Sequence, residues 1–365
     1  MFTPLIGTRI KALREERKLS QDDLARVFGF KDRQTVSAIE TGERKLSADE
    51  LLTAVEKLGT SLDYFTNPFI LVGEGKFNWR QSGVGLPRLQ AFERSAGRRI
   101  AAYRRLAPQV GRPIPLLRRT LGITSRASFE EAAAAGERFA AEFKLGDISA
   151  KRLTGIMEHE LGVLVLMVDA LEGVSGAACR LPALDTVLIN RREPPGRRHF
   201  DLAHELFHIL TWDTMPPEHV EESSEHSKSR VEQLANSFAS ALLMPASTLE
   251  RFGPWDRDIV RRLNHTANAL EVTATALMWR LVSLGRLDRT APKEVPEVAL
   301  RNNGRPASAR DPLTPLFSKP FAEVMALAIE QGRLSARRAA DLLEMKLEDL
   351  IELSESHGVK VSFEL

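Results

Sequence analysis

Residues 199–210, HFDLAHELFHIL, place two histidines four positions apart, with a glutamate directly after the first. On a helix, at about 100° per residue, Asp201, His204, Glu205 and His208 share one narrow face, and apolar side chains cover most of the rest. Such a helix is expected to be buried, and burying four titratable groups is costly unless they are paired or bind a metal. The stretch therefore predicts a metal site on a buried helix. A pair of hydrogen-bonded core histidines is the alternative.

Two histidines need a third ligand, and the sequence offers two sources for it. A histidine six residues after His208 is missing, because Thr211 and Thr214 stand where that longer zinc motif has Gly and His. One source is the polar loop that follows, which holds His219, Glu221, Glu222, Glu225 and His226. The other is a helix over residues 230–244, ended by Pro245, which presents Glu232, Ala235, Asn236 and Ala239 on one face. Small residues on that face let the two helices pack closely, so we expect Glu232 to reach the metal. Two histidines and one glutamate with an open fourth position are a catalytic zinc arrangement.

HFDLAHELFHIL followed by EQLANSFASALLMP resembles the ImmA/IrrE family of zinc metallopeptidases, over roughly residues 140–290. The segments LGVLVLMVD, VSGAACRLP and DTVLIN are expected as strands before the active-site helix, and residues 272–287 resemble the family's later helical segment. The resemblance implies that His204, His208 and Glu232 bind Zn²⁺ and that Glu205 is the general base. The sequence departs from the family at His199, Asp201 and Phe207, none of which is a ligand.

The resemblance also implies metal-assisted hydrolysis of a peptide bond, in which Glu205 takes a proton from water and passes it to the leaving amine. Asp201, one turn before Glu205, is expected to orient the metal ligands from outside. We expect the strand around residues 187–190 to bind an extended substrate by strand addition.

The N-terminal residues 1–66 are expected to form a helix-turn-helix bundle. Ser20 is a predicted N-cap with Asp23 three residues later, Gly29 ends that helix, and a short helix covers residues 33–40 before Gly42. LSQDDLARVFGFKDRQTVSAIETGERKLS resembles the XRE family of DNA-binding domains. That resemblance assigns base contacts to Arg33, Gln34, Thr35 and Ser37, and phosphate contacts to Gln21, Arg44 and Lys45.

Charge predicts how that domain binds DNA. Residues 1–66 hold 11 basic and 11 acidic residues, so a monomer is expected to bind weakly and to need dimerisation or another basic segment. Residues 67–130 hold 12 basic and 3 acidic residues, a net charge of +9 within a chain of net charge +2. This excess predicts a nucleic-acid contact that could activate the peptidase; a solvated helical surface is the alternative.

Length and composition favour a soluble protein of two or three domains. The chain has 365 residues, 27% of them charged. Cys179 is the single cysteine, which excludes an intramolecular disulfide and fits a reducing cytoplasm. The N-terminus lacks the apolar core of a signal peptide, and no apolar run reaches the length of a membrane span. We therefore expect a cytoplasmic protein without a membrane partner.

The remaining segments complete the predicted organisation. Residues 67–139 are expected as a basic linker with helical segments, 140–290 as the peptidase domain and 291–316 as a linker. Residues 317–365 are expected as a C-terminal helical domain, with Ser335 capping a helix to about Leu343 and VKVSFEL as a short strand. The helical pair is either a second helix-turn-helix-like unit or an element for packing or dimerisation. The fold class is α+β and mostly helical, with a zincin-like domain built around a small sheet.

Two functions follow from these expectations. The first is a zinc-dependent protease with a DNA-binding domain, which cleaves a transcriptional repressor in a stress or DNA-damage response. The alternative is a transcriptional regulator whose peptidase-like domain is a sensor or dimerisation module with little proteolytic turnover. A homodimer is compatible with either function.

Overall fold

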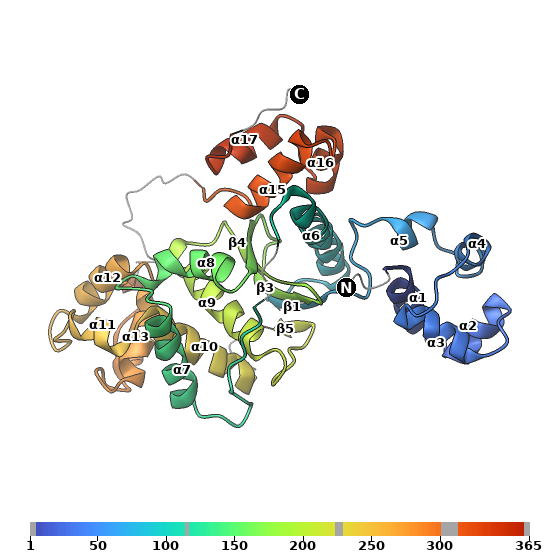
Figure 1. The fold of residues 1–365 in the computed structure, drawn as a ribbon. Helices are drawn as coiled ribbons and strands as arrows, with labels where there is room; N and C mark the ends of the chain where they lie inside the picture. The colour runs from blue at the N-terminus through green and yellow to red at the C-terminus, as the bar shows by residue number, and fades with distance from the viewer. Residues whose placement is uncertain (1–4, 114–116, 223–228, 301–312, 361–365) are drawn as a thin grey trace.

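A five-stranded sheet forms the middle layer of the molecule, with helices on both of its faces, and a helical bundle precedes it in the chain (Figure 1). This computed structural model describes residues 5–113, 117–222, 229–300 and 313–360. Buried apolar side chains form three clusters: one in the N-terminal bundle and one on each face of the sheet. The predicted α+β, mostly helical fold class is confirmed.

The N-terminal bundle consists of five helices whose ends follow local capping. Ser20 caps the second helix in a capping box with Asp23, and Gly29 ends it with a φ of 72°, as the sequence predicts. Gly42 ends the third helix with a φ of 83°. The helices are α1 (Leu5–Glu16), α2 (Gln21–Phe28), α3 (Arg33–Thr41), α4 (Ala48–Lys57) and α5 (Leu62–Thr66).

The sheet has the strand order β2-β4-β3-β1-β5. Its strands are β1 (Lys76–Gln81), β2 (Val163–Val168), β3 (Val174–Leu181), β4 (Leu184–Asn190) and β5 (Val220–Glu222). The pairs β2–β4 and β1–β5 are parallel, and the other neighbours are antiparallel. Alternate residues of one strand enter opposite cores: Val187 lies in one cluster and Leu188 in the other. This alternation explains why the strands are apolar runs, since both faces of the sheet are covered.

One face of the sheet is covered by the helices between α7 and α14. They are α7 (Phe129–Glu142), α8 (Ser149–His159), α9 (Pro195–Thr211), α10 (Arg230–Leu243), α11 (Ala246–Glu250), α12 (Ile259–Leu270), α13 (Ala274–Ser283) and α14 (Ala291–Glu294), followed by a 3₁₀ turn at Glu297–Ala299. Helices α7 and α10 pack closely at Gly136, where an added Cβ would lie 2.4 Å from the carbonyl oxygen of Phe238.

The first part of the predicted linker 291–316 is structured, because it forms α14 and the 3₁₀ turn that follows. Residues 301–312 lie outside the described ranges.

The opposite face of the sheet is covered by α6 (Leu86–Leu106), a 3₁₀ turn at Ala107–Val110, α15 (Lys319–Glu330), α16 (Ala336–Leu343) and α17 (Asp349–Ser356). The C-terminal helices share a core with β2, β3 and β4. Residues 317–360 therefore pack on the sheet and are not the separate C-terminal domain that the sequence predicts. Met167 of β2 also pairs with Phe317 through backbone hydrogen bonds. Of the predicted strand 359–365, Val359 and Lys360 have no regular structure, and the rest lies outside the described residues.

Residues 67–139 contain the helical segments that the sequence predicts, but they are more than a basic linker. They supply β1, which lies between β3 and β5, as well as α6 and most of α7. The start of this segment also fixes the N-terminal bundle: the buried Arg9 donates to the carbonyl oxygens of Tyr64 (2.8 Å) and Ile70 (2.7 Å). Composition alone does not show that this segment is part of the folded core, because its arginines alternate with apolar residues that are buried there.

Candidate metal centre

Helix α9 places the predicted metal stripe in the interior. His204, Glu205 and His208 are each 0% exposed. The helix follows Pro194 and runs along β3 and β4. The Nε2 atoms of His204 and His208 lie 3.1 Å apart, so both rings face one point. This spacing is what histidines at positions i and i+4 of a helix allow.

Helix α10 brings Glu232 to the same point. Its Oε2 lies 3.2 Å from His204 Nε2, and its Oε1 lies 3.0 Å from His208 Nε2. One ligand atom from each of the three residues lies within 4.8 Å of the others. Ala235 and Ala239 are 0% exposed, in agreement with the prediction that small side chains allow the approach of the two helices. The donor set, two imidazoles and one carboxylate, suits a zinc ion.

Asn236 fixes the orientation of the first histidine. Its Oδ1 lies 3.0 Å from His204 Nδ1, and a carbonyl oxygen can only accept, so the proton of the neutral ring is on Nδ1. The lone pair of Nε2 is then free to bind a metal. Burial, the largest cause, lowers the pKa of His204 from 6.5 to about 4, which keeps the ring in its neutral, metal-binding form.

Glu205 has the environment of a reactive carboxyl group. Both of its carboxylate oxygens are buried and have no hydrogen-bond partner among the described residues. Burial raises the pKa of Glu205 well above its ordinary value, while the charge of Arg80 acts in the opposite direction. A buried polar group without partners needs an explanation, and a bound ion with its water is one that this site fits. A Cβ at position 176 would lie 2.9 Å from the carbonyl oxygen of Leu188, which favours glycine there, and 3.5 Å, an ordinary contact distance, from Oε1 of Glu205.

Asp201, which the sequence predicts to orient the metal ligands from outside, pairs with two arginines. It accepts from Arg80 Nη1 at 2.6 Å and from Arg197 Nε at 3.1 Å, and it is 0% exposed. The residue that orients His204 is Asn236. Sequence reasoning missed Arg80, because it lies 121 positions from Asp201 in a segment interpreted as a linker. Asn236 shares a helix face with Glu232 in the sequence, but the sequence alone does not show which side chain it contacts.

The expected strand addition at residues 187–190 is wrong. Strand β4 lies between β2 and β3, so both of its edges are already paired. The loop alternatives for the third ligand also fall away where the structure describes them: His219 Nε2 lies 2.6 Å from Glu93 Oε2 and is not part of the cluster. Glu225 and His226 lie outside the described residues, and the side chains of Glu221 and Glu222 are not described.

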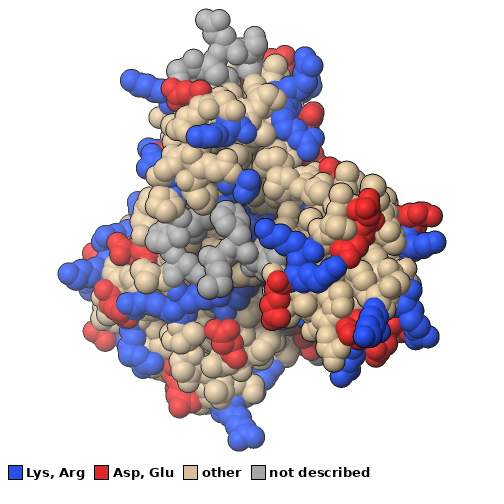
Figure 2. Space-filling model, turned by 45° about the vertical axis from the view of Figure 1, so that its right-hand side comes forward, with Lys and Arg blue, Asp and Glu red and all other residues tan. Residues whose placement is uncertain are grey.

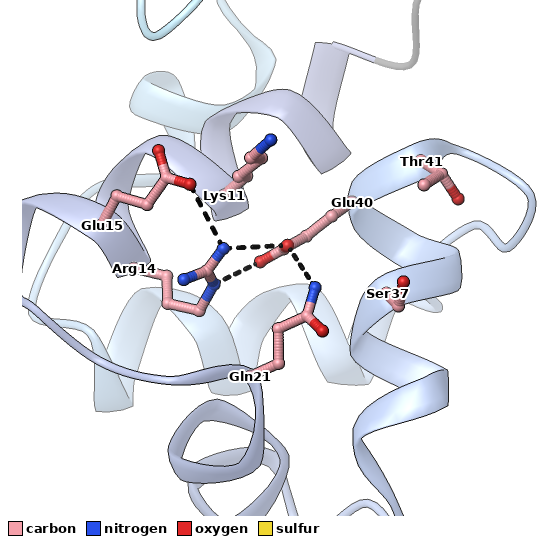
Figure 3. A pocket seen from close by; sticks show the side chains of 7 residues that line it. All are labelled: Lys11, Arg14, Glu15, Gln21, Ser37, Glu40 and Thr41. Atoms are coloured by element: carbon pink, nitrogen blue, oxygen red, sulfur yellow. Dashed lines mark hydrogen bonds and ion pairs between the residues drawn. The ribbon is translucent and has the colours of Figure 1, made fainter.

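The predicted DNA-contact residues divide into two groups. Gln21 donates to Glu40 Oε2 at 2.9 Å, and Arg14 binds the same carboxylate, as Figure 3 shows for the pocket that these side chains line. Arg44 binds Glu50 through two hydrogen bonds (2.6 and 3.1 Å). By contrast, Arg33, Gln34 and Lys45 are exposed, and Thr35 and Ser37 are partly exposed. The exposed group is the better placed to meet DNA.

The basic segment 67–130 is partly neutralised within the molecule. Its ion pairs are Arg80–Asp201, Arg98–Glu344, Arg99–Glu344, Arg104–Glu74, Arg112–Glu323, Arg118–Asp185 and Arg119–Glu142. Six of these seven pairs use an acid from outside the segment. On the face drawn in Figure 2, basic and acidic side chains are interspersed. Ion pairs within the molecule therefore account for part of the charge excess.

In the ranges that the structure describes, no helix is both long enough and apolar enough to cross a bilayer.

Two family models match separate segments of the chain. Residues 10–65 match the helix-turn-helix family, and residues 159–281 match the IrrE N-terminal-like domain, a peptidase family. The second range contains both histidines, Glu205 and Glu232.

Curated relatives agree with the second match. The radiation response metalloprotease IrrE of Deinococcus deserti is 35% identical over 118 residues, which are 30% of this chain and 39% of the relative. The protein of the same name from Deinococcus radiodurans is 35% identical over 107 residues, 27% of this chain and 31% of the relative. The similarity thus spans well under half of either relative. This chain joins an XRE-type helix-turn-helix domain at its N-terminus to a peptidase domain of the ImmA/IrrE type.

Proposed function

We propose that this protein is a zinc-dependent, site-specific protease that cleaves a transcriptional repressor in a stress or DNA-damage response. The observation that carries the proposal is the buried cluster of His204, His208 and Glu232 beside the unpartnered carboxyl group of Glu205. The names of the two curated relatives, which are radiation response metalloproteases, support the kind of response.

The residues of the chain would divide the chemistry as follows. His204, His208 and Glu232 would hold the zinc ion, which would supply a Lewis acid and lower the pKa of a bound water. Glu205 would accept a proton from the attacking water and would pass it to the amine of the departing peptide. Asn236 keeps Nε2 of His204 unprotonated. Burial of all these groups excludes bulk water and so strengthens each electrostatic interaction.

The helix-turn-helix domain is proposed to bind double-stranded DNA and to place the protease at an operator. Arg33, Gln34 and Lys45, the exposed members of the predicted contact group, would make the contacts. A glutamine on a recognition helix can bind adenine through two hydrogen bonds.

A test of the protease function compares wild type with Glu205→Gln. Each would be co-expressed with the repressors encoded beside it, and zinc content would be measured on the purified proteins. We expect wild type to cleave one repressor at one bond, and Glu205→Gln to keep its zinc but to cleave nothing. Equal cleavage by both proteins would contradict the assignment of Glu205.

One observation favours a second function. The three potential ligands are 0–6% exposed, as is common for a structural zinc site. In that case the protein would be a transcriptional regulator whose peptidase-like domain serves as a sensor or dimerisation module. Stoichiometric zinc in wild type without cleavage of any repressor, with and without DNA damage, would support this alternative.

A further inference from the structure

We propose that residues 218–222 occupy the substrate-binding edge of β1, so that an extended substrate must displace this segment of the chain. The inference rests on the proposed protease function and concerns the regulation of the same site. It starts from the sheet order, in which β5 is an edge strand and β1 is its only neighbour.

The edge of β1 lies beside the reactive carboxyl group. Arg80 of β1 is paired in register with Gly176 of β3, the residue whose Cβ would lie 3.5 Å from Glu205. Arg80 also binds Asp201 of α9 at 2.6 Å, one turn before Glu205. Strand β1 is therefore about one strand spacing, near 5 Å, from the strand that contacts Glu205, and a peptide in the place of β5 would be about two spacings from it. An extended peptide bound there would run alongside the catalytic helix.

Backbone contacts hold the segment in the position that a peptide would take. The N–H of Trp79 donates to the carbonyl oxygen of His219 at 3.0 Å. Trp79, Arg80 and Gln81 pair in parallel with the three residues of β5. The side chain of Asn78 donates to the carbonyl oxygen of Glu218 at 2.7 Å. Contacts of this kind accept almost any sequence, as expected of a site that binds substrates by strand addition.

A side-chain clamp adds to these backbone bonds. Oε2 of Glu93, on α6, lies 2.6 Å from His219 Nε2 and accepts from Trp79 Nε1 at the same distance. The carboxylate thus joins the covering segment to the strand that it covers. His219 is itself exposed, so this contact can break without opening a core.

The position of the segment in the chain connects it to the metal centre. Residues 212–229 join α9, which carries both histidines, to α10, which carries Glu232. The ligands are almost fully buried, so a substrate needs a change in what covers them. A substrate that competes with β5 for β1 would act on the connection between the two ligand-bearing helices.

The test uses a proline to weaken the pairing of β5. Glu221→Pro removes an N–H from the covering strand, and Glu221→Ala is the matched control that keeps it. Both are made in the full chain with Glu205→Gln, so that binding is measured without turnover. The probe is fluorescein-labelled β-casein, an unfolded protein, followed by anisotropy. Hydrogen exchange of residues 76–81 reports whether β1 is covered.

Glu221→Pro should expose β1 to exchange, bind casein severalfold more tightly than Glu221→Ala, and regain protection of β1 when casein is added. Unchanged exchange in Glu221→Pro, or equal casein binding while β1 is demonstrably exposed, would overturn the proposal. His219→Ala, which removes the contact with Glu93 from the covering segment and leaves β1 intact, should have the same effects in smaller measure and guards against a folding defect of the proline variant. These readouts need no hydrolysis, so failure of the proposed protease function would appear separately, as absence of cleavage by the protein with Glu205 intact.

Discussion

Asn236 accepts a hydrogen bond from Nδ1 of His204 at 3.0 Å, one helical turn after Glu232 on the same helix. A single face of α10 therefore supplies both a ligand and the residue that orients another ligand. Outer residues of this kind set the tautomer of a metal-bound histidine and strengthen metal binding.

We predict that Asn236→Leu weakens zinc binding by about 10–100-fold, because the orientation of His204 is lost while the ligands remain. Competition for zinc with a chromophoric chelator measures this change. Ser240→Ala, further along the same helix, is the control and should bind zinc as wild type does. An affinity of Asn236→Leu within about twofold of wild type would contradict the role given to Asn236.

The ion pair between Arg80 and Asp201 should contribute strongly to stability. We predict that Arg80→Met destabilises the protein by about 3–5 kcal/mol, because a buried carboxylate loses its main partner. The double variant Arg80→Met, Asp201→Leu should recover much of this loss. Urea unfolding of the four proteins in this cycle measures the coupling, and strictly additive effects would contradict it.

The buried Glu158, which lies away from the metal centre, should make the free energy of unfolding depend on pH. Burial is the largest cause that raises its pKa, to about 7, and contacts with Ser318 and the backbone of Val165 offset this only in part. Because the folded-state pKa lies above the unfolded one, this residue's contribution to stability is fully present below about pH 4.5 and is lost as the pH rises through 7.

Glu158→Gln cannot ionise, so it should be more stable than wild type at pH 8, by up to about 3 kcal/mol, relative to their difference at pH 4. Urea unfolding at the two pH values tests this. A stability difference between the two proteins that does not change with pH would show that Glu158 titrates normally.

The exposed residues of α3 and the loop after it should dominate DNA binding. Gln34→Ala is expected to cost about 1–3 kcal/mol on the specific operator and much less on unrelated DNA. Lys45→Ala should weaken both about equally and reduce the dependence of binding on salt. Arg44→Ala serves as the comparison: because Arg44 is paired with Glu50, its loss should leave the salt dependence nearly unchanged. These effects can be measured by fluorescence anisotropy over a range of salt concentrations.

The sequence predicted that His204, His208 and Glu232 come together, because its signals are local. Histidines at positions i and i+4 and the small residues around Glu232 depend only on helical periodicity, which α9 and α10 confirm. The capping residues Ser20 and Gly29 are likewise local signals, and they predicted the two ends of α2 in the N-terminal bundle.

What the sequence did not show depends on contacts between distant segments. Arg80 belongs to a strand that joins the sheet across more than 90 intervening residues, and its composition resembled that of a linker. Strand β4 was expected at an edge, but strand order is set by packing of the whole sheet rather than by any one strand. The C-terminal helices show an amphipathic pattern, and the pattern alone does not say that their apolar face packs on α6 and the sheet.

The zinc content of purified wild type, Glu232→Ala and His219→Ala, determined by elemental analysis, tests the central claim most directly. Our account predicts one zinc per chain in wild type and in His219→Ala, and a marked loss in Glu232→Ala, because Glu232 is the acid that, among the residues the structure describes, lies within 3.2 Å of both histidines. Full zinc content in Glu232→Ala together with a loss in His219→Ala would contradict the metal centre described above.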